Sequence, residues 1–172
     1  MNGVTSNGYR YYSNRVTCPV PTMDSLVHVQ SSSCFQVISD NSILKNWTDA
    51  RDACDNEGGR LAVLDTKGKI DTVIDVMRDN TDFPQVGFYL GAHRPMDRWN
   101  TAWPNGEQDY IWLNGQPLDP DLTAPYWKDS DPNNWQDGQN VIMLYGDQGI
   151  SRPWVDDNAD RIEGYICEFS LI

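Results

Sequence analysis

The chain has 172 residues, a length that fits one domain burying roughly two-thirds of its unfolded surface in a single core. Acidic residues outnumber basic residues by 25 to 13, and the resulting net charge of -12 argues against nucleic acid or an anionic membrane as a partner, because both would be repelled. No apolar run approaches the roughly 18 residues that a membrane-spanning helix needs, so we expect no transmembrane segment.

The N-terminal part of the chain predicts an extension followed by a hairpin. Residues 1–17 are polar and are expected to form an N-terminal extension, with one domain over residues 18–172. The segment from 18 to 34 has alternating valines and favours a hairpin, and residues 34–38 read as a strand.

Two amphipathic helices are expected next. Asn46 is suited to cap the first helix, and Gly58-Gly59 is suited to end it. Residues 60–64 alternate and predict a short strand, after which Thr66 opens the second helix. Both helices place apolar residues on one face: Trp47, Ala50 and Cys54 in the first, and Ile70, Val73, Ile74 and Met77 in the second.

The second half predicts strands separated by a long irregular segment. Between residues 94 and 139 the chain is rich in Pro, Gly, Asn, Asp and Trp, and a loop of this length in a compact domain is usually functional or disordered. Its tryptophans argue against disorder. The order of elements predicts an α+β domain with two helices and small antiparallel sheets. The expected strands are 86–91, 110–113, 141–145, 154–156 and 164–169.

Four cysteines and the absence of a C-x-x-C pair favour disulfides over zinc or thioredoxin-type chemistry. Cysteines alone leave three pairings open among Cys18, Cys34, Cys54 and Cys167. The first residues lack the features of a signal peptide, so the chain is expected to be either a mature secreted form or cytosolic. The cysteines favour the secreted, extracellular form, and the sequon that begins at Asn46 gives weak support for a glycoprotein.

The richest chemistry lies between residues 126 and 135. Asp131 and Asn133 flank Pro132, and an X-Pro bond is the one place where a cis peptide is cheap. A cis bond would aim both side-chain oxygens at one point, as a Ca²⁺ site requires. The alternative is a plain turn, since Asp, Pro and Asn are common turn residues.

Six segments, in order, give the chain a resemblance to the C-type lectin-like domain family from Cys18 to Phe169. These segments are Trp47-x-x-Ala50-x-x-x-Cys54 with Gly58-Gly59-x-Leu61, Tyr89-Leu90-Gly91-Ala92, Tyr110-Ile111-Trp112-Leu113-Asn114-Gly115, Asp131-Pro132-Asn133, Trp154-Val155-Asp156, and Ile166-Cys167-Glu168. The resemblance implies a disulfide-stapled fold with bridges from Cys54 to Cys167 and from Cys18 to Cys34. The family's further bridge, which pins the binding loop, is absent because Val141 and Ala159 stand near its two positions. We therefore expect the loop to be held by other means, such as its tryptophans or a cation.

The resemblance also implies a loop Ca²⁺ ion that binds vicinal sugar hydroxyls. Asp131, Asn133, Gln139 and Asp156 fall at the positions of the metal ligands in sugar-binding members. Gln139 replaces a glutamate, and Val155 replaces an asparagine ligand. Since Ca²⁺ affinity follows the charge and number of ligands, Ca²⁺ binding is expected to be weak or absent unless neighbours such as Asp137 and Asp157 contribute.

The type of sugar stays open. Asn133 after the proline resembles the mannose-type triplet, whereas Trp135 sits where galactose-binding members place a tryptophan. An indole face suits the apolar face of a galactose ring, although Trp135 is equally suited to packing within the loop.

The main hypothesis is a calcium-dependent carbohydrate-binding module with Asp131, Asn133, Trp135, Gln139 and Asp156 at its site. The alternative is a module that has lost Ca²⁺ and binds a protein or another surface through the Trp-rich loop. An enzyme is disfavoured, because only His28 and His93 are available as neutral-pH bases and neither lies near a nucleophile motif.

Overall fold

The structure, a computed structural model, describes residues 25–28, 33–79, 87–102, 109–128, 130–145 and 153–171. These residues form an eight-stranded sheet in the order β1-β2-β8-β4-β6-β7, with β3 paired to β8 and β5 paired to β4. The strands are β1 Ser25–His28, β2 Ser33–Ile38, β3 Arg60–Leu61, β4 Gly87–His93, β5 Ile111–Trp112, β6 Val141–Tyr145, β7 Trp154–Asp157 and β8 Gly164–Ser170.

The helices are α1 Trp47–Asn56, α2 Lys67–Asp79 and the four-residue α3 Pro120–Thr123, with short 3-10 turns η2 Met96–Arg98, η4 Ala124–Tyr126 and η5 Trp135–Asp137. The predicted α+β class is confirmed, with two differences of detail. The strands form one continuous sheet, and β4 pairs with β8 in parallel while the other pairings between named strands are antiparallel. The helix α3 adds a third helix to the expected two.

Helix α1 begins where the sequence predicts. The side chain of Asn46 accepts a hydrogen bond from the backbone N–H of Asp49 at 2.9 Å, and its Nδ2 donates to the Asp49 carboxylate, also at 2.9 Å. The first of these bonds satisfies one of the backbone donors that the first helical turn leaves open, and the second joins the two side chains. The apolar face of Trp47, Ala50 and Cys54 is buried as expected.

Helix α2 begins after Thr66, whose hydroxyl accepts from the backbone N–H of Lys69 at 3.3 Å. Its predicted apolar stripe is buried against the sheet. The strand expected over residues 60–64 is shorter, because only Arg60 and Leu61 pair as β3, with β8. Residues 61–64 are all buried instead of alternating, since this segment runs through the core between α1 and α2.

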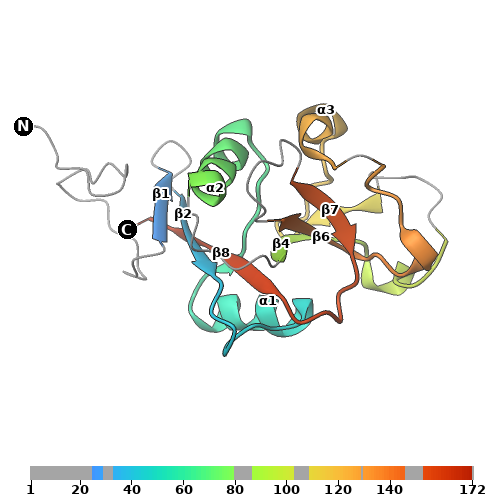
Figure 1. Ribbon diagram of the computed structural model, residues 1–172, viewed down its shortest axis with the longest axis horizontal. Coiled ribbons are helices and arrows are strands. Elements are labelled where there is room, and N and C mark those ends of the chain that lie inside the picture. Colours follow the sequence, from blue (N-terminus) through green and yellow to red (C-terminus); the bar gives the residue numbers. More distant parts are fainter. Residues whose placement is uncertain are drawn as a thin grey trace, which may run out of the picture.

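The two helices lie on opposite sides of the sheet (Figure 1). Each face carries its own cluster of buried apolar side chains, one built with α1 and the other with α2 and three tryptophans. The three tryptophans are Trp112, Trp127 and Trp154. Two of them, Trp112 and Trp127, belong to the long irregular segment and fill the core, which agrees with the expectation that its tryptophans order it.

The disulfide between Cys54 and Cys167 ties α1 to β8, as the resemblance implies. Cys34 on β2 is also disulfide-bonded. Its expected partner Cys18, the proposed extension over 1–17 and the domain boundary after it lie outside the described residues.

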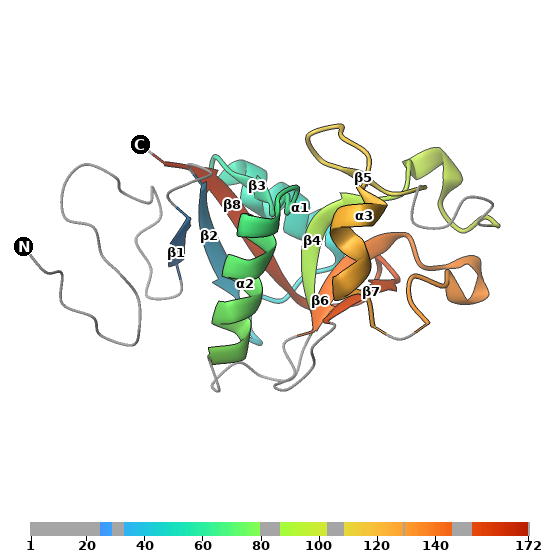
Figure 2. The same cartoon turned by 90° about the horizontal axis from the view of Figure 1, so that it is seen from above.

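The C-terminal end of β8 runs beside the β1–β2 hairpin, because Ser170 pairs with Ser33. Strands β6 and β7 lie at the other end of the molecule, together with the turns η2 and η5 (Figures 1 and 2). The C-terminal end of β8 and the predicted binding loop therefore lie at opposite ends of the domain.

Candidate functional site

The segment of residues 130–140, which we call the Pro132 loop, leads from η4 into β6. Its peptide bond between Asp131 and Pro132 is cis, as the sequence analysis suggested. The start of the loop is anchored to β7, since the backbone N–H of Lys128 donates to the carbonyl of Trp154 at 2.8 Å. The loop thus lies against β7, the strand that carries Asp156.

Asp156 is the anchor of the Pro132 loop. Its side chain is almost fully buried, with the residue 1% exposed. Its carboxylate accepts the backbone N–H of Asn133 at 3.1 Å and that of Asn134 at 2.6 Å. The hydroxyl of Tyr110 lies 3.4 Å from the same carboxylate. Burial raises the pKa of Asp156, and the hydrogen bonds from the two asparagine N–H groups oppose that rise.

Asp131 lies beside Asp156 and is half-buried. The side-chain amide of Asn133 donates to it at 2.5 Å. Burial and the negative charge of Asp156 raise the pKa of Asp131 to about 6, a rise that the charge of Lys128 partly offsets. Two carboxylates of like charge therefore share this corner of the structure.

Replacing Asp131 with asparagine is expected to stabilise the metal-free domain at pH 7.5 by about 1 kcal/mol after allowance for solvent screening. The folded-state pKa lies above the ordinary value of 3.8, so the folded state binds more protons than the unfolded state between these values. The wild type therefore loses stability as pH rises through this window, whereas the asparagine variant does not. Urea unfolding of both proteins in chelator, from pH 4 to pH 8, measures the effect. If the unfolding free energies of the two proteins changed in parallel with pH, this prediction would be wrong.

Asp156 differs from the other buried acids in having no basic partner. Each of the others forms an ion pair with an arginine or lysine: Asp109 with Arg94 and Arg98, Asp157 and Glu163 with Arg161, and Glu168 with Arg60 and Lys69. Within the described parts of the chain, no ion pair involves Asp156 or Asp131. Buried charges in proteins are normally paired or bound to a metal, so these two carboxylates are the candidates for a cation.

Gln139 lies in the predicted site but uses both ends of its amide within the protein. Its Nε2 donates to the backbone carbonyl of Asp156 at 2.6 Å, and its Oε1 accepts the backbone N–H of Trp135 at 2.5 Å. Val155 is buried in the core and offers no side-chain oxygen. The predicted helper Asp157 is committed to an ion pair with Arg161 at 2.9 Å.

The oxygen donors that fit Ca²⁺ are the carboxylates of Asp131 and Asp156. Asn133 turns its amide nitrogen toward Asp131, so its side-chain carbonyl would join them only after the amide rotates by half a turn. These are hard oxygen ligands of the kind that Ca²⁺ prefers, and among the described residues neither carboxylate forms an ion pair. The described residues contain no group of three or more His, Cys, Asp or Glu side chains that could hold a metal. These residues therefore fit a Ca²⁺ site with few protein ligands. Water or the hydroxyls of a bound molecule would fill the remaining coordination positions.

Trp135 stands at the tip of the Pro132 loop and is 68% exposed. The backbone around it is unusual, because Asn134, Gln136 and Asp137 have φ values of 46°, 56° and 57°. Non-glycine residues rarely adopt this left-handed conformation, and such residues cluster at binding sites. The exposure of Trp135 is the opposite of what packing within the loop predicts.

The structure adds three polar residues that the sequence analysis did not single out. Asn134 is 5% exposed, and its Nδ2 donates to the carbonyl of Thr101 at 3.3 Å. Asn140 joins Asn100 through two hydrogen bonds of 3.0 Å. Tyr110 donates to the carbonyl of Gln139 at 2.9 Å. No local pattern marks these residues, because their partners are distant in sequence.

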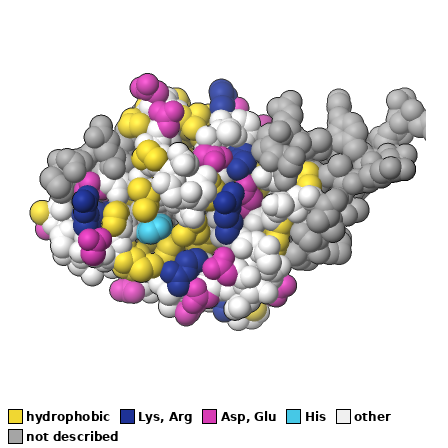
Figure 3. Space-filling model, turned by 180° about the vertical axis from the view of Figure 1, so that it is seen from behind, with side chains coloured by type: hydrophobic (Ala, Val, Ile, Leu, Met, Phe, Trp, Pro, Cys, Tyr) yellow, Lys and Arg dark blue, Asp and Glu magenta, His cyan; other side chains and the backbone are white. Residues whose placement is uncertain are grey.

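A second face of the molecule carries hydrophobic side chains gathered around a histidine (Figure 3). His93 packs against Trp47 with 5.1 Å between ring centroids, and its Nδ1 lies 2.7 Å from the carbonyl of Arg94. Burial lowers the pKa of His93, and the nearby charge of Arg51 lowers it further. The ring thus stays neutral and serves packing at this position.

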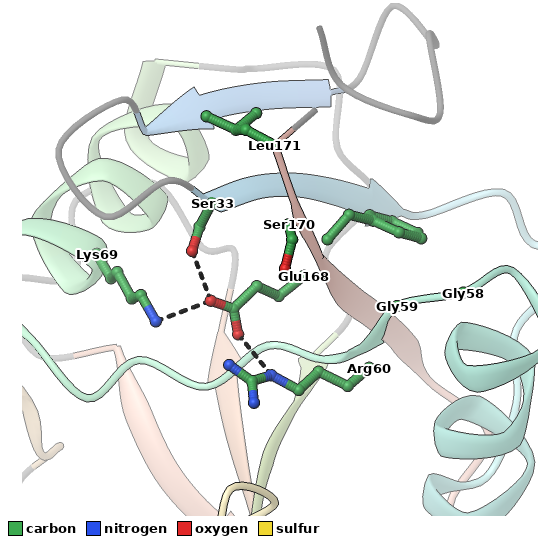
Figure 4. A pocket seen from close by; sticks show the side chains of 9 residues that line it. Ser33, Gly58, Gly59, Arg60, Lys69, Glu168, Ser170 and Leu171 are labelled. Carbon is green, nitrogen blue, oxygen red and sulfur yellow. Dashed lines mark hydrogen bonds and ion pairs between the residues drawn. The ribbon is translucent and has the colours of Figure 1, made fainter. Parts of the chain in front are cut away.

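A polar cavity of about 380 Å³ lies beside β2 and β8, near Ser170 and Leu171 (Figure 4). Glu168 projects into it and accepts hydrogen bonds from Ser33, Lys69 and Arg60. Both carboxylate oxygens are engaged. Lys69 also pairs with Asp65 at 3.0 Å, so two acids and two bases balance one another in this cluster. It lies at the opposite end of the molecule from the Pro132 loop, and we assign it a structural role.

Three comparisons with known proteins bear on this site. A family model described as the Lectin C-type domain matches residues 43–169. Lectin BRA-3 from Megabalanus rosa is 27% identical over 66 residues, which are 38% of this chain and 37% of that protein, so the chain covers well under two-thirds of that relative's length.

Solved structures have the same fold at low identity. The C-type lectin domain of murine dendritic cell inhibitory receptor 2, in complex with N-glycan, gives a TM-score of 0.65 at 18% identity over 88% of this chain and 99% of that chain. A calcium-independent type II antifreeze protein gives 0.63 at 17% identity over 94% of this chain and 100% of that chain. At these identities the similarity concerns the fold.

Proposed function

Because the chain belongs to the family of lectin C-type domains, we propose that it recognises carbohydrate through a Ca²⁺ ion held by the Pro132 loop and β7. The domain is a recognition module and not an enzyme, in keeping with this family. The ligand class proposed is a mannose- or galactose-type sugar with vicinal hydroxyls.

One observation carries the proposal: Asp131 and Asp156 lie side by side, partly or fully buried, with no basic partner among the described residues. Elsewhere in the described chain every buried acid has such a partner. A divalent cation would supply the missing positive charge and would lower the raised pKa of Asp131. Asn133 would add its side-chain carbonyl, and Gln139 would hold the loop backbone around the ion.

A bound Ca²⁺ ion supplies positive charge and open coordination positions for sugar hydroxyls. The protein's own groups would do the rest. The carboxylates of Asp131 and Asp156 would accept hydrogen bonds from those hydroxyls, and the exposed indole of Trp135 would cover an apolar sugar face. The murine receptor domain with N-glycan supports a carbohydrate as the ligand.

Adding Ca²⁺ is expected to raise the thermal unfolding midpoint, because a ligand that binds only the folded state stabilises it. At a Ca²⁺ concentration 100 times the dissociation constant, the gain is about 2.7 kcal/mol. Thermal unfolding of wild type, of Asp131→Ala and of Asp97→Ala, each in Ca²⁺ and in chelator, measures it. Asp97 is an exposed acid on η2 and serves as the matched control.

The shift should be present in wild type and Asp97→Ala and absent in Asp131→Ala. Glycan arrays of mannose and galactose series, probed with and without chelator, then identify the sugar. No shift in wild type at millimolar Ca²⁺ would contradict the proposal.

The second candidate is recognition of a protein or another surface without Ca²⁺. The observation that favours it is Gln139, whose amide is fully engaged within the loop, and the similarity in fold to a calcium-independent antifreeze protein is compatible with it. In that case Trp135→Ala would abolish binding of the domain to its protein or surface partner, whereas chelator would leave that binding unchanged.

An extracellular location is part of the proposal. The Cys54–Cys167 disulfide supports an oxidising compartment, and glycosylation of Asn46 would agree with it. Among the described residues no helix is long and apolar enough to cross a membrane.

A further inference from the structure

We infer that Gln139 holds the Pro132 loop in its folded form without a metal, so that Ca²⁺ serves ligand binding and is not needed to order the loop. This inference rests on the proposed function, since it concerns the division of labour at the same site. It assigns Gln139 as a positioning residue and not as a metal ligand.

The first step is the position of Gln139 between the loop tip and β7. Its Oε1 accepts the N–H of Trp135 at 2.5 Å, and its Nε2 donates to the carbonyl of Asp156 at 2.6 Å. One side chain therefore closes the loop on itself and ties it to the sheet.

The second step is that the other limb of the loop is fixed to the same residue. The carboxylate of Asp156 accepts the N–H groups of Asn133 and Asn134. The side chain of Asn134 in turn accepts the N–H of Gln139 at 3.3 Å. Residues 133–139 are thus bound to β7 on both limbs and to each other, by hydrogen bonds alone.

The third step concerns the chemistry that only an amide offers at this position. The carbonyl of Asp156 needs a donor, and a carboxylate at position 139 has none when ionised. A glutamate there would still accept the Trp135 N–H but would face the Asp156 carbonyl with no proton to donate. A loop with glutamate at position 139 would need a cation to stay closed on β7. The amide N–H of Gln139 instead donates to the Asp156 carbonyl directly.

The fourth step is that nothing covalent holds the loop. No cysteine lies between residues 127 and 145, and the described disulfide joins α1 to β8. Val141 and Ala159, which stand where the resemblance places the missing bridge, are both buried in the cluster on the α1 face. The loop depends on its hydrogen bonds.

Hydrogen exchange of the whole chain, followed by mass spectrometry, tests the inference in Ca²⁺ and in chelator. The reporters are the amides of Asn133, Asn134 and Trp135, whose acceptors lie in the clamp. Wild type is compared with Gln139→Glu and with Gln136→Glu, the same substitution at an exposed loop position. We expect wild-type protection to change less than twofold when Ca²⁺ is removed. In chelator the three amides of Gln139→Glu should exchange at least tenfold faster than those of wild type, and Ca²⁺ should restore the wild-type exchange rates. The amides of Gln136→Glu should exchange at the wild-type rates in both conditions.

Two results would overturn the inference. Loss of wild-type protection in chelator would mean that the metal orders the loop, and unchanged protection in Gln139→Glu would mean that this side chain is not the clamp. Calcium titration calorimetry of the same proteins keeps the proposed function separate. Wild type that binds no Ca²⁺ but keeps its protection in chelator would end the proposed function and leave the clamp standing. Gln139→Glu should bind Ca²⁺ at least tenfold more tightly than wild type.

Discussion

Replacing Glu168 with alanine is expected to lower the free energy of unfolding by about 3 kcal/mol, because the buried Lys69 loses one of its two carboxylate partners and the buried N–H of Val63 loses its acceptor. The Lys69 ammonium lies 2.8 Å from one carboxylate oxygen, which also accepts the Ser33 hydroxyl at 2.7 Å. The other oxygen accepts from Arg60 at 3.0 Å and from the backbone N–H of Val63 at 3.1 Å. One side chain thus joins β2, β8, α2 and the segment after β3.

The pH dependence of this effect has a definite sign. Burial raises the pKa of Glu168, but the hydrogen bonds from Lys69 and Ser33 outweigh it, so the pKa lies below its ordinary value of 4.5. A depressed pKa contributes stability above the unfolded value that is lost as pH falls through the folded value. The difference between wild type and variant should therefore be largest near neutral pH and shrink in acid.

Urea unfolding at pH 7 and at pH 3.5 measures both statements. Asp52→Ala is the control, since the exposed pair of Asp52 and Arg51 should contribute less than about 1 kcal/mol. If Glu168→Ala lowered the free energy of unfolding by as little as the control does, the hydrogen bonds and ion pairs of Glu168 would contribute little to stability.

Removing the Cys54–Cys167 disulfide is the second large effect. The double variant Cys54→Ala, Cys167→Ala should be less stable by about 2–5 kcal/mol. The bridge spans 113 residues of sequence, and a long closed loop restricts the unfolded chain more than a short one. Since both residues are buried in the core on the α1 face, the alanines also leave small voids.

Urea unfolding with and without a reductant checks this prediction. Reductant should shift the wild-type midpoint toward that of the double variant, and should shift the double variant much less. Equal stability of the two oxidised proteins would contradict it. The two oxidised proteins differ only at Cys54 and Cys167, so comparing them without reductant isolates the effect of this one bridge.

Much of the fold follows from local patterns. Asn46 as a helix cap, the apolar face of α1 and the stripe of α2 are properties of neighbouring residues, and the structure has them where the sequence placed them. The family and the bridge of Cys54 to Cys167 came from motifs in their expected order, and both are confirmed. The residues around Pro132 left a cis bond possible beside a plain turn, and the structure has the cis bond.

The rest depends on contacts between distant residues. The parallel pairing of β4 with β8 cannot be read from either strand alone. The bonds of Gln139 to Trp135 and Asp156 depend on a loop conformation with several left-handed residues, which no local pattern announces. The sequence placed Gln139 among the metal ligands, and only the geometry of its amide suggests the different role proposed above. Whether Asp131, Asn133 and Asp156 bind Ca²⁺ stays a prediction.

The placement of the chain's C-terminal end has a practical consequence. Leu171 follows β8 beside the β1–β2 hairpin, at the end of the molecule away from the Pro132 loop (Figure 1). A tether attached there leaves Trp135 facing outward. Copies fixed to a bead or a sensor surface through this end would all present their loops in one direction, and weak single-site contacts would add up by raising the effective concentration of the second site. Under the proposed function, dense immobilisation through Leu171 should therefore hold a multivalent glycan far longer than sparse immobilisation does.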